Sequence, residues 1–97
     1  MAVATAAPTS ANTLIETARA ELRLALAART AGNRVSYPAR KADRLVRAMN
    51  ALRNHDLRAA IDLLRGLVLC DRAEPHGRRA LALAAAALVV QGAGVPA

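Results

Sequence analysis

Few side chains in this chain of 97 residues have catalytic potential. His55 and Asp56 are adjacent, and a histidine beside a carboxylate is the pairing used in general-base catalysis. Neighbouring residues in a turn seldom point at the same spot, and Asp56 stands where a helix cap is expected, which favours a structural role. Cys70 is the only cysteine, and it lacks the helix N-terminus or cationic cluster that activates a thiol. We therefore expect no catalytic residues and no enzymatic activity.

Metal and cofactor sites are not predicted either. His55 and His76 are the only histidines, and together with the scattered carboxylates they lack the spacing of a chelating set. No glycine-rich run opens a helix, so the sequence has no phosphate-binding loop. We expect the protein to hold neither a metal nor a cofactor.

Basic residues outnumber acidic ones by 14 to 7, which gives a net charge of +7. Arg40, Arg44 and Arg47 follow one another at helical spacing, and such a stripe can bind phosphates. One hypothesis is therefore that these three arginines bind DNA or RNA; the other is that the charge keeps a chain rich in Leu and Ala in solution. Two features argue against nucleic acid: residues 57–70 are too apolar for a recognition helix, and Tyr37 is the only aromatic side chain that could stack on a base.

The elements that carry these residues are predicted to be helices. The chain has no Phe or Trp, and the β-branched and aromatic residues that favour strands are scarce. Apolar residues recur at spacings of three and four, which indicates an all-α fold with an antiparallel four-helix arrangement. The helices are expected at 13–31, 37–53, 57–70 and 75–91. Residues 1–11 are expected to form a disordered tail, 12–92 a single domain and 93–97 a loose end.

Specific residues are predicted to begin and end these helices. Thr13 and Glu16 have the spacing of a capping box, in which each side chain bonds to the other residue's amide. Asp56 is the expected cap of the third helix. Gly92 is the expected end of the fourth helix. Gly66 lies inside the third helix, where it either marks a close helix crossing or has no special role.

Residues 53–74, RNHDLRAAIDLLRGLVLCDRAE, resemble the second half of a tetratricopeptide (TPR) unit, and the resemblance extends over about 38–92. A turn, the acidic cap Asp56, a bulky Leu57 and a small Ala60 follow in the order of that pattern. His55 stands where glycine is usual, and Arg72 stands where proline is usual. The resemblance implies helix-turn-helix packing and a protein that binds other proteins. Small TPR-like chaperones of bacterial secretion systems are similar in size.

Surplus apolar surface gives the leading functional prediction. The last helix is apolar on all sides from Ala80 to Val90, and such a helix must be covered on most sides. We expect a non-catalytic adaptor or small chaperone whose cover is a protein partner or a second copy of the chain. This apolar run is too short to span a membrane, and the first residues lack a secretory signal, which predicts a cytoplasmic protein. The expected contact residues are Leu64, Leu67, Leu81 and Leu88.

Overall fold

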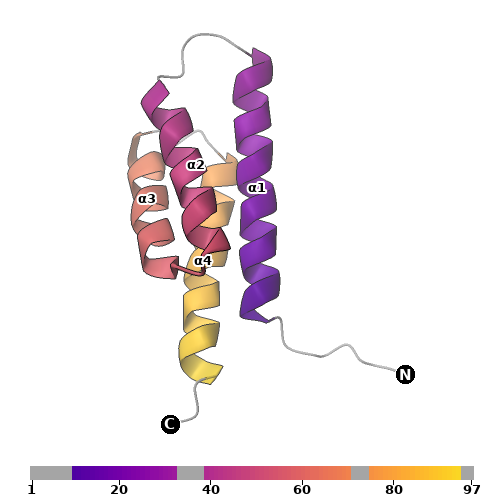
Figure 1. Ribbon diagram of the computed structural model, residues 1–97, viewed down its shortest axis with the longest axis vertical. Coiled ribbons are helices and arrows are strands. Elements are labelled where there is room, and N and C mark those ends of the chain that lie inside the picture. Colours follow the sequence, from indigo (N-terminus) through magenta and orange to yellow (C-terminus); the bar gives the residue numbers. More distant parts are fainter. Residues whose placement is uncertain (1–9, 33–38, 71–74, 95–97) are drawn as a thin grey trace, which may run out of the picture.

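The computed structural model describes residues 10–32, 39–70 and 75–94. They form α1 (Ala11–Gly32), α2 (Ala39–Arg53), α3 (Leu57–Cys70) and α4 (Pro75–Gly94). Successive helices run in opposite directions, and α4 returns beside α1 (Figure 1). The predicted all-α, antiparallel four-helix arrangement is therefore confirmed. Most of the two predicted loose ends, 1–9 and 95–97, lies outside the described residues.

The first helix begins earlier than predicted because a different residue caps it. The backbone N–H of Thr13 donates to the side-chain oxygen of Ser10, with 3.1 Å between the two atoms. Ser10 is therefore the N-cap, and α1 begins at Ala11. The prediction of Thr13 as the cap is wrong, and Glu16 forms an ion pair with Arg19 at 3.0 Å.

The fourth helix ends later than predicted. It continues through Gly92 to Gly94, so the prediction that Gly92 ends it is wrong. No described glycine has the positive φ that a left-handed helix cap requires. In the described ranges, none of the helices combines enough length with enough hydropathy to cross a membrane.

The turn between α2 and α3 is a tight, fully hydrogen-bonded connection. His55 adopts a φ of 61°, the left-handed conformation that glycine usually provides at this position. Its N–H donates to the carbonyl of Leu52 at 3.0 Å, and the N–H of Asp56 donates to the carbonyl of Ala51 at 2.8 Å. These two bonds form a Schellman motif. Asp56 also caps α3, as predicted, because its carboxylate accepts the N–H of Ala59 at 3.3 Å.

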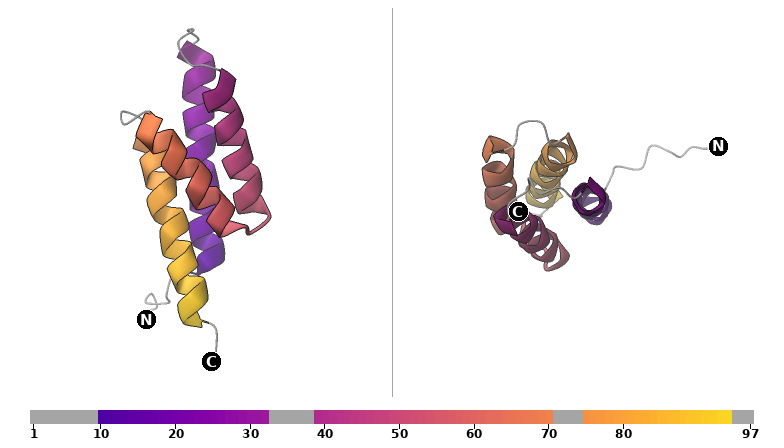
Figure 2. Two further views of the ribbon diagram at one scale, coloured as in Figure 1. Left: turned by 90° about the vertical axis from the view of Figure 1, so that its left-hand side faces the viewer. Right: turned by 90° about the horizontal axis from the view of Figure 1, so that it is seen from above.

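The core lies between the four helices and consists of Leu, Ile and Ala side chains. In α4 the buried hydrophobic residues are all alanines, whose small side chains let its backbone approach α1 closely. These two helices, the first and last in the chain, form the most extensive contact and lie side by side in the end-on view of Figure 2. The buried residues are Ile15, Ala18, Leu22 and Ala25 from α1; Leu45, Ala48 and Leu52 from α2; Leu57, Ala60, Ile61, Leu64 and Leu67 from α3; and Ala80, Ala84 and Ala87 from α4.

Candidate interaction surfaces

The four leucines predicted to contact a partner divide between core and surface. Leu64 and Leu67 are 0% and 1% exposed, because they project from α3 into the centre of the bundle. The structure corrects this part of the prediction: both residues belong to the core. Leu81 and Leu88 are half-buried at the edge of the core, where they flank the alanines of α4. Of the four leucines, only these two reach the surface.

The outer face of α4 carries no charge over most of its length. We use this name for Ala82, Ala85, Ala86 and Val89, of which all but the half-buried Ala86 are exposed. The side chain of Val89 is 69% exposed. From Ala80 to Gly94 the helix contains no Asp, Glu, Lys or Arg. The face is thus an apolar surface at the side of α4 that points away from the core.

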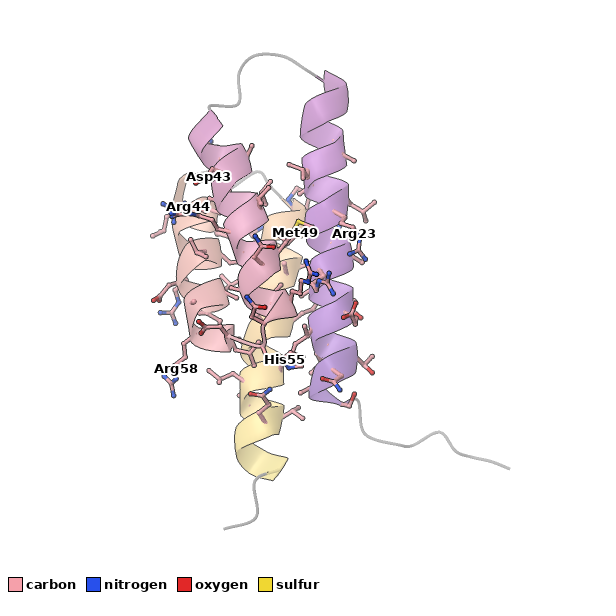
Figure 3. The ribbon with its side chains drawn as sticks, in the orientation of Figure 1. Arg23, Asp43, Arg44, Met49, His55 and Arg58 are labelled. Carbon is pink, nitrogen blue, oxygen red and sulfur yellow. The ribbon has the colours of Figure 1, made fainter. Side chains whose placement is uncertain are left out.

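The predicted arginine stripe on α2 is not a single phosphate-binding row. The side chain of Arg40 lies outside the described part of the structure. Arg47 pairs with Asp43 on its own helix, with 3.4 Å between the charged atoms. Arg44 reaches toward α3 (Figure 3) and covers Gly66, where an added Cβ would lie only 2.6 Å from its Nη1 atom. Gly66 therefore provides space for a guanidinium group rather than for a close approach of two backbones.

A shallow groove lies between α3 and α4, and arginines of α3 form its rim. The exposed residues Arg58, Asp62 and Arg65 of α3 line it, together with Ile61 and the half-buried Leu88 of α4. We call it the α3–α4 groove. Neither arginine forms an ion pair within the described residues.

Sequence reasoning gave no role to the two arginines of the groove. Arg58, Asp62 and Arg65 have the same helical spacing as Arg40, Arg44 and Arg47. The repeated spacing could have indicated a second row of exposed side chains on α3. Only the fold shows that the side chain of Arg44 lies against α3.

A polar cluster connects the middle of α1 with the first turns of α4. Oε1 of Glu21 lies 2.7 Å from Nδ1 of His76 and 3.1 Å from Nε of Arg79. Arg79 Nη2 is also 3.1 Å from the same histidine nitrogen. Because Nδ1 cannot donate and accept at once, we assign its proton to the bond with the stronger acceptor, the Glu21 carboxylate. The hydrogen bond from His76 lowers the pKa of Glu21, and the hydrogen bond and positive charge of Arg79 lower it further. Burial acts in the opposite direction, but its effect on the pKa is smaller than the sum of the others.

Three of the described titratable side chains, those of Glu21, Asp56 and His76, have structural partners. Glu21 and His76 join two helices, and Asp56 caps α3, so the adjacent His55 is not oriented by that carboxylate. The side chain of Cys70 lies outside the described part. Within the described ranges, no three His, Cys, Asp or Glu side chains are grouped so that they could hold a metal ion.

Comparison with protein-family models finds no match for this chain, and comparisons with curated proteins and with solved structures find none either. The TPR resemblance therefore stays a prediction. Two surfaces of the described structure bear on its function: the uncharged outer face of α4 and the α3–α4 groove with its arginines.

Proposed function

We propose that the protein is a non-catalytic protein-interaction module, an adaptor or small chaperone that binds its partner through α4. The observation that carries the proposal is the outer face of α4, with Val89 69% exposed and no charge from Ala80 to Gly94. Contiguous exposed apolar surface on a small protein commonly marks a site of protein association.

The other helices support this assignment by contrast. The exposed charges of α4 lie only in its first turns, at Arg78 and Arg79. Exposed charges occur along the length of the other helices: Glu16 and Arg23 on α1, Asp43 and Arg47 on α2, and Arg58 and Asp62 on α3. Charge on an exposed face favours solvent over a protein surface, because a charge loses hydration when it is covered. The face of α4 is the one that another chain can cover at the smallest cost in desolvation.

A single charge placed on this face tests the proposal. Ala85→Glu puts a carboxylate at the centre of the outer face, and Ala27→Glu puts one at an exposed alanine of α1. We expect wild-type protein to retain a partner from an extract of its source, or to self-associate in light scattering. Ala85→Glu should abolish that association, whereas Ala27→Glu should preserve it.

Helicity measured by circular dichroism is the control for folding, since both substitutions replace exposed alanines. A wild-type protein that is strictly monomeric in light scattering and retains no partner would contradict the proposal. Equal loss of association in both variants would also contradict it, because the effect would then reflect net charge and not the α4 face.

A second candidate function is DNA or RNA binding, and one observation favours it. Arg44 crosses from α2 to α3, so that it adds a third cation to Arg58 and Arg65 on that side of the molecule. Fluorescence anisotropy with a labelled nucleic acid at two salt concentrations tests it, since phosphate contacts weaken as salt rises. No binding at low salt, or binding unchanged in Arg44→Glu, would contradict this function.

The TPR resemblance and a cytoplasmic location belong to the same proposal. A TPR-like unit would bind a segment of another protein, in agreement with a non-catalytic role. In stacked helical repeats each unit contacts only its neighbours, whereas here α1 and α4 close the bundle. A partner would therefore meet the outside of the bundle and not the inside of a curved array.

A further inference from the structure

We propose that the α3–α4 groove binds an acidic amphipathic segment of a partner protein. An apolar side chain of that segment enters the groove, and carboxylates on either side of it pair with Arg58 and Arg65. This inference rests on the proposed function and names the chemistry of the partner.

The floor of the groove is apolar. Ile61 of α3 is 8% exposed, and Leu88 of α4 is half-buried. These two side chains remain partly in contact with solvent, since the alanines of α4 fill the centre of the bundle and leave its leucines at the margin. A Leu or Ile side chain from a partner would remove this remaining apolar surface from water.

The rim of the groove is cationic. Arg58 and Arg65 are seven residues apart on α3, which is two helical turns or about 10 Å along the axis. Both side chains are exposed, and neither has a carboxylate partner among the described residues. Arginine forms bidentate bonds with carboxylates, so two acidic residues about two turns apart on a helical segment match this rim. Arg44, held over Gly66, adds a third cation on the same side of the bundle.

The groove suits a peptide better than a nucleic acid. Asp62 lines it together with the two arginines, so an unbroken row of phosphates would also meet a carboxylate, whereas a peptide can place its acidic residues opposite the arginines alone. The lining includes no aromatic side chain on which a base could stack. An apolar floor with charged edges is the complement of an amphipathic helix, which presents apolar residues on one face and charges beside them.

The test measures binding of a labelled synthetic peptide that has Leu at helical spacing and Glu at the flanking positions. We expect wild-type protein to bind it in fluorescence anisotropy, and Arg58→Glu or Arg65→Glu to bind about tenfold more weakly. The matched control is Arg23→Glu on α1, which makes the same change in net charge on the opposite side of the molecule (Figure 3). This control should bind within about twofold of wild type. Asp62→Asn should bind more tightly, because it removes the one acidic side chain of the rim.

Besides a failure of the peptide to bind, three outcomes would overturn the inference. Equal weakening by Arg23→Glu and Arg65→Glu would mean that only net charge matters. Equal affinity for a polyglutamate peptide would mean that no apolar side chain enters the groove. Tighter binding of a single-stranded DNA of similar length, sensitive to Arg65→Glu, would assign the rim to nucleic acid.

Circular dichroism confirms that each variant remains helical, and Arg65→Gln is the milder substitute if Arg65→Glu does not fold. The experiment separates this inference from the proposed function. If the peptide does not bind while Ala85→Glu still abolishes association, the groove assignment fails and the α4 assignment stands. If association also survives Ala85→Glu, both fail.

Discussion

The α1–α4 contact and the α2–α3 contact are built from different side chains. In α4 the buried hydrophobic residues are Ala80, Ala84 and Ala87, whereas those of α1 include the larger Ile15 and Leu22. The buried hydrophobic residues of α2 and α3 are instead mainly leucines, among them Leu45 and Leu64, with one alanine in each helix. Polar side chains also take part in both contacts: Glu21 with His76 between α1 and α4, and Arg44 over Gly66 between α2 and α3.

This difference explains where the apolar surface of α4 lies. A helix that packs through alanines has to place its larger residues elsewhere, and in α4 they lie beside or opposite the buried stripe. Leu81 and Leu88 are half-buried at its flanks, and Val89 is exposed on the outer face. Close packing of α4 on α1 and an apolar outside of α4 are therefore two results of the same sequence pattern.

The largest effect is expected where leucines make the contact. Leu64→Ala should lower the free energy of unfolding by about 2–5 kcal/mol, because it leaves a cavity in the fully buried centre of the bundle. Urea denaturation followed by circular dichroism measures the change. Leu69→Ala on the same helix, where the side chain is 73% exposed, should change it by less than about 0.5 kcal/mol. Similar losses in both variants would mean that α3 does not face the core as described.

The alanine contact should respond to the opposite change. Ala84→Leu inserts a large side chain between α1 and α4 and should destabilise the protein by about 1–3 kcal/mol through overpacking. Ala85→Leu, one residue further on the exposed side, is the matched control and should leave stability nearly unchanged. If Ala84→Leu stabilised the protein, the α1–α4 contact would contain unfilled space, and the contrast between the two contacts would be lost.

The two contacts also differ in how well the sequence predicted them. The turn between α2 and α3 depends on turn and cap residues that lie close together in the sequence. The observed end of α2 at Arg53 and start of α3 at Leu57 agree with the prediction. Near the two ends of the chain, the residues that could begin α1 or end α4 allowed more than one boundary. Ser10 and Thr13 are both good N-cap residues. In the structure Ser10 is the cap, and the first turn of α1 that follows it packs Ala11 and Leu14 against the core. Gly92 is a strong stop signal on its own, but α4 continues past it as an ordinary helix.

Periodicity identified apolar residues but not which of them meet another helix. It assigned Leu64 and Leu67 to a partner surface because helix α3 looked apolar on more than one side, whereas both side chains are covered by the chain itself. The position of Arg44 over Gly66 joins residues more than twenty positions apart, and no local pattern contains that information. The groove and its rim therefore required the fold.

A change in the α2–α3 turn should stabilise the protein. His55 has a φ of 61°, which costs a residue with a Cβ about 1 kcal/mol relative to glycine. His55→Gly should raise the free energy of unfolding by about 1 kcal/mol in thermal or urea denaturation. His55→Ala keeps the unfavourable conformation and should bring no gain. A loss of stability in His55→Gly would indicate that the imidazole makes a contribution beyond the turn.

Two glycine substitutions compare the helices more finely. Gly92→Ala in α4 should stabilise by about 0.5–1 kcal/mol, because the site is helical and an added Cβ meets nothing within 4 Å. Gly66→Ala in α3 should gain less, since its Cβ would displace the Arg44 guanidinium. Urea denaturation of both variants, and of each in an Arg44→Ala background, measures the difference. Removal of Arg44 should restore the gain at Gly66 and leave that at Gly92 unchanged.

The smallest effect concerns the polar cluster of the α1–α4 contact. The pKa of Glu21 is lower in the folded protein than its ordinary value of 4.5, because the ionised form accepts hydrogen bonds from His76 and Arg79. A carboxyl group of this kind stabilises the fold above its unfolded pKa, and the contribution disappears as the pH falls through the folded pKa. At neutral pH, Glu21→Gln should therefore cost about 0.5 kcal/mol, since Arg79 is more than half exposed and the pair is screened by solvent.

The difference between wild type and Glu21→Gln should shrink as the pH falls from 4.5 through the lower pKa of Glu21 in the folded protein, because below that pKa both side chains are uncharged. Urea denaturation across this range measures it, with Glu16→Gln as the control. Among the described residues, Glu16 pairs with Arg19 of its own helix alone, and its side chain is 63% exposed, so its removal should give a smaller difference at every pH. A pH-independent cost in Glu21→Gln would mean that the carboxylate contributes through its shape and packing and not through its charge. The cluster would then be part of the packing between α1 and α4, in the same way as the alanines.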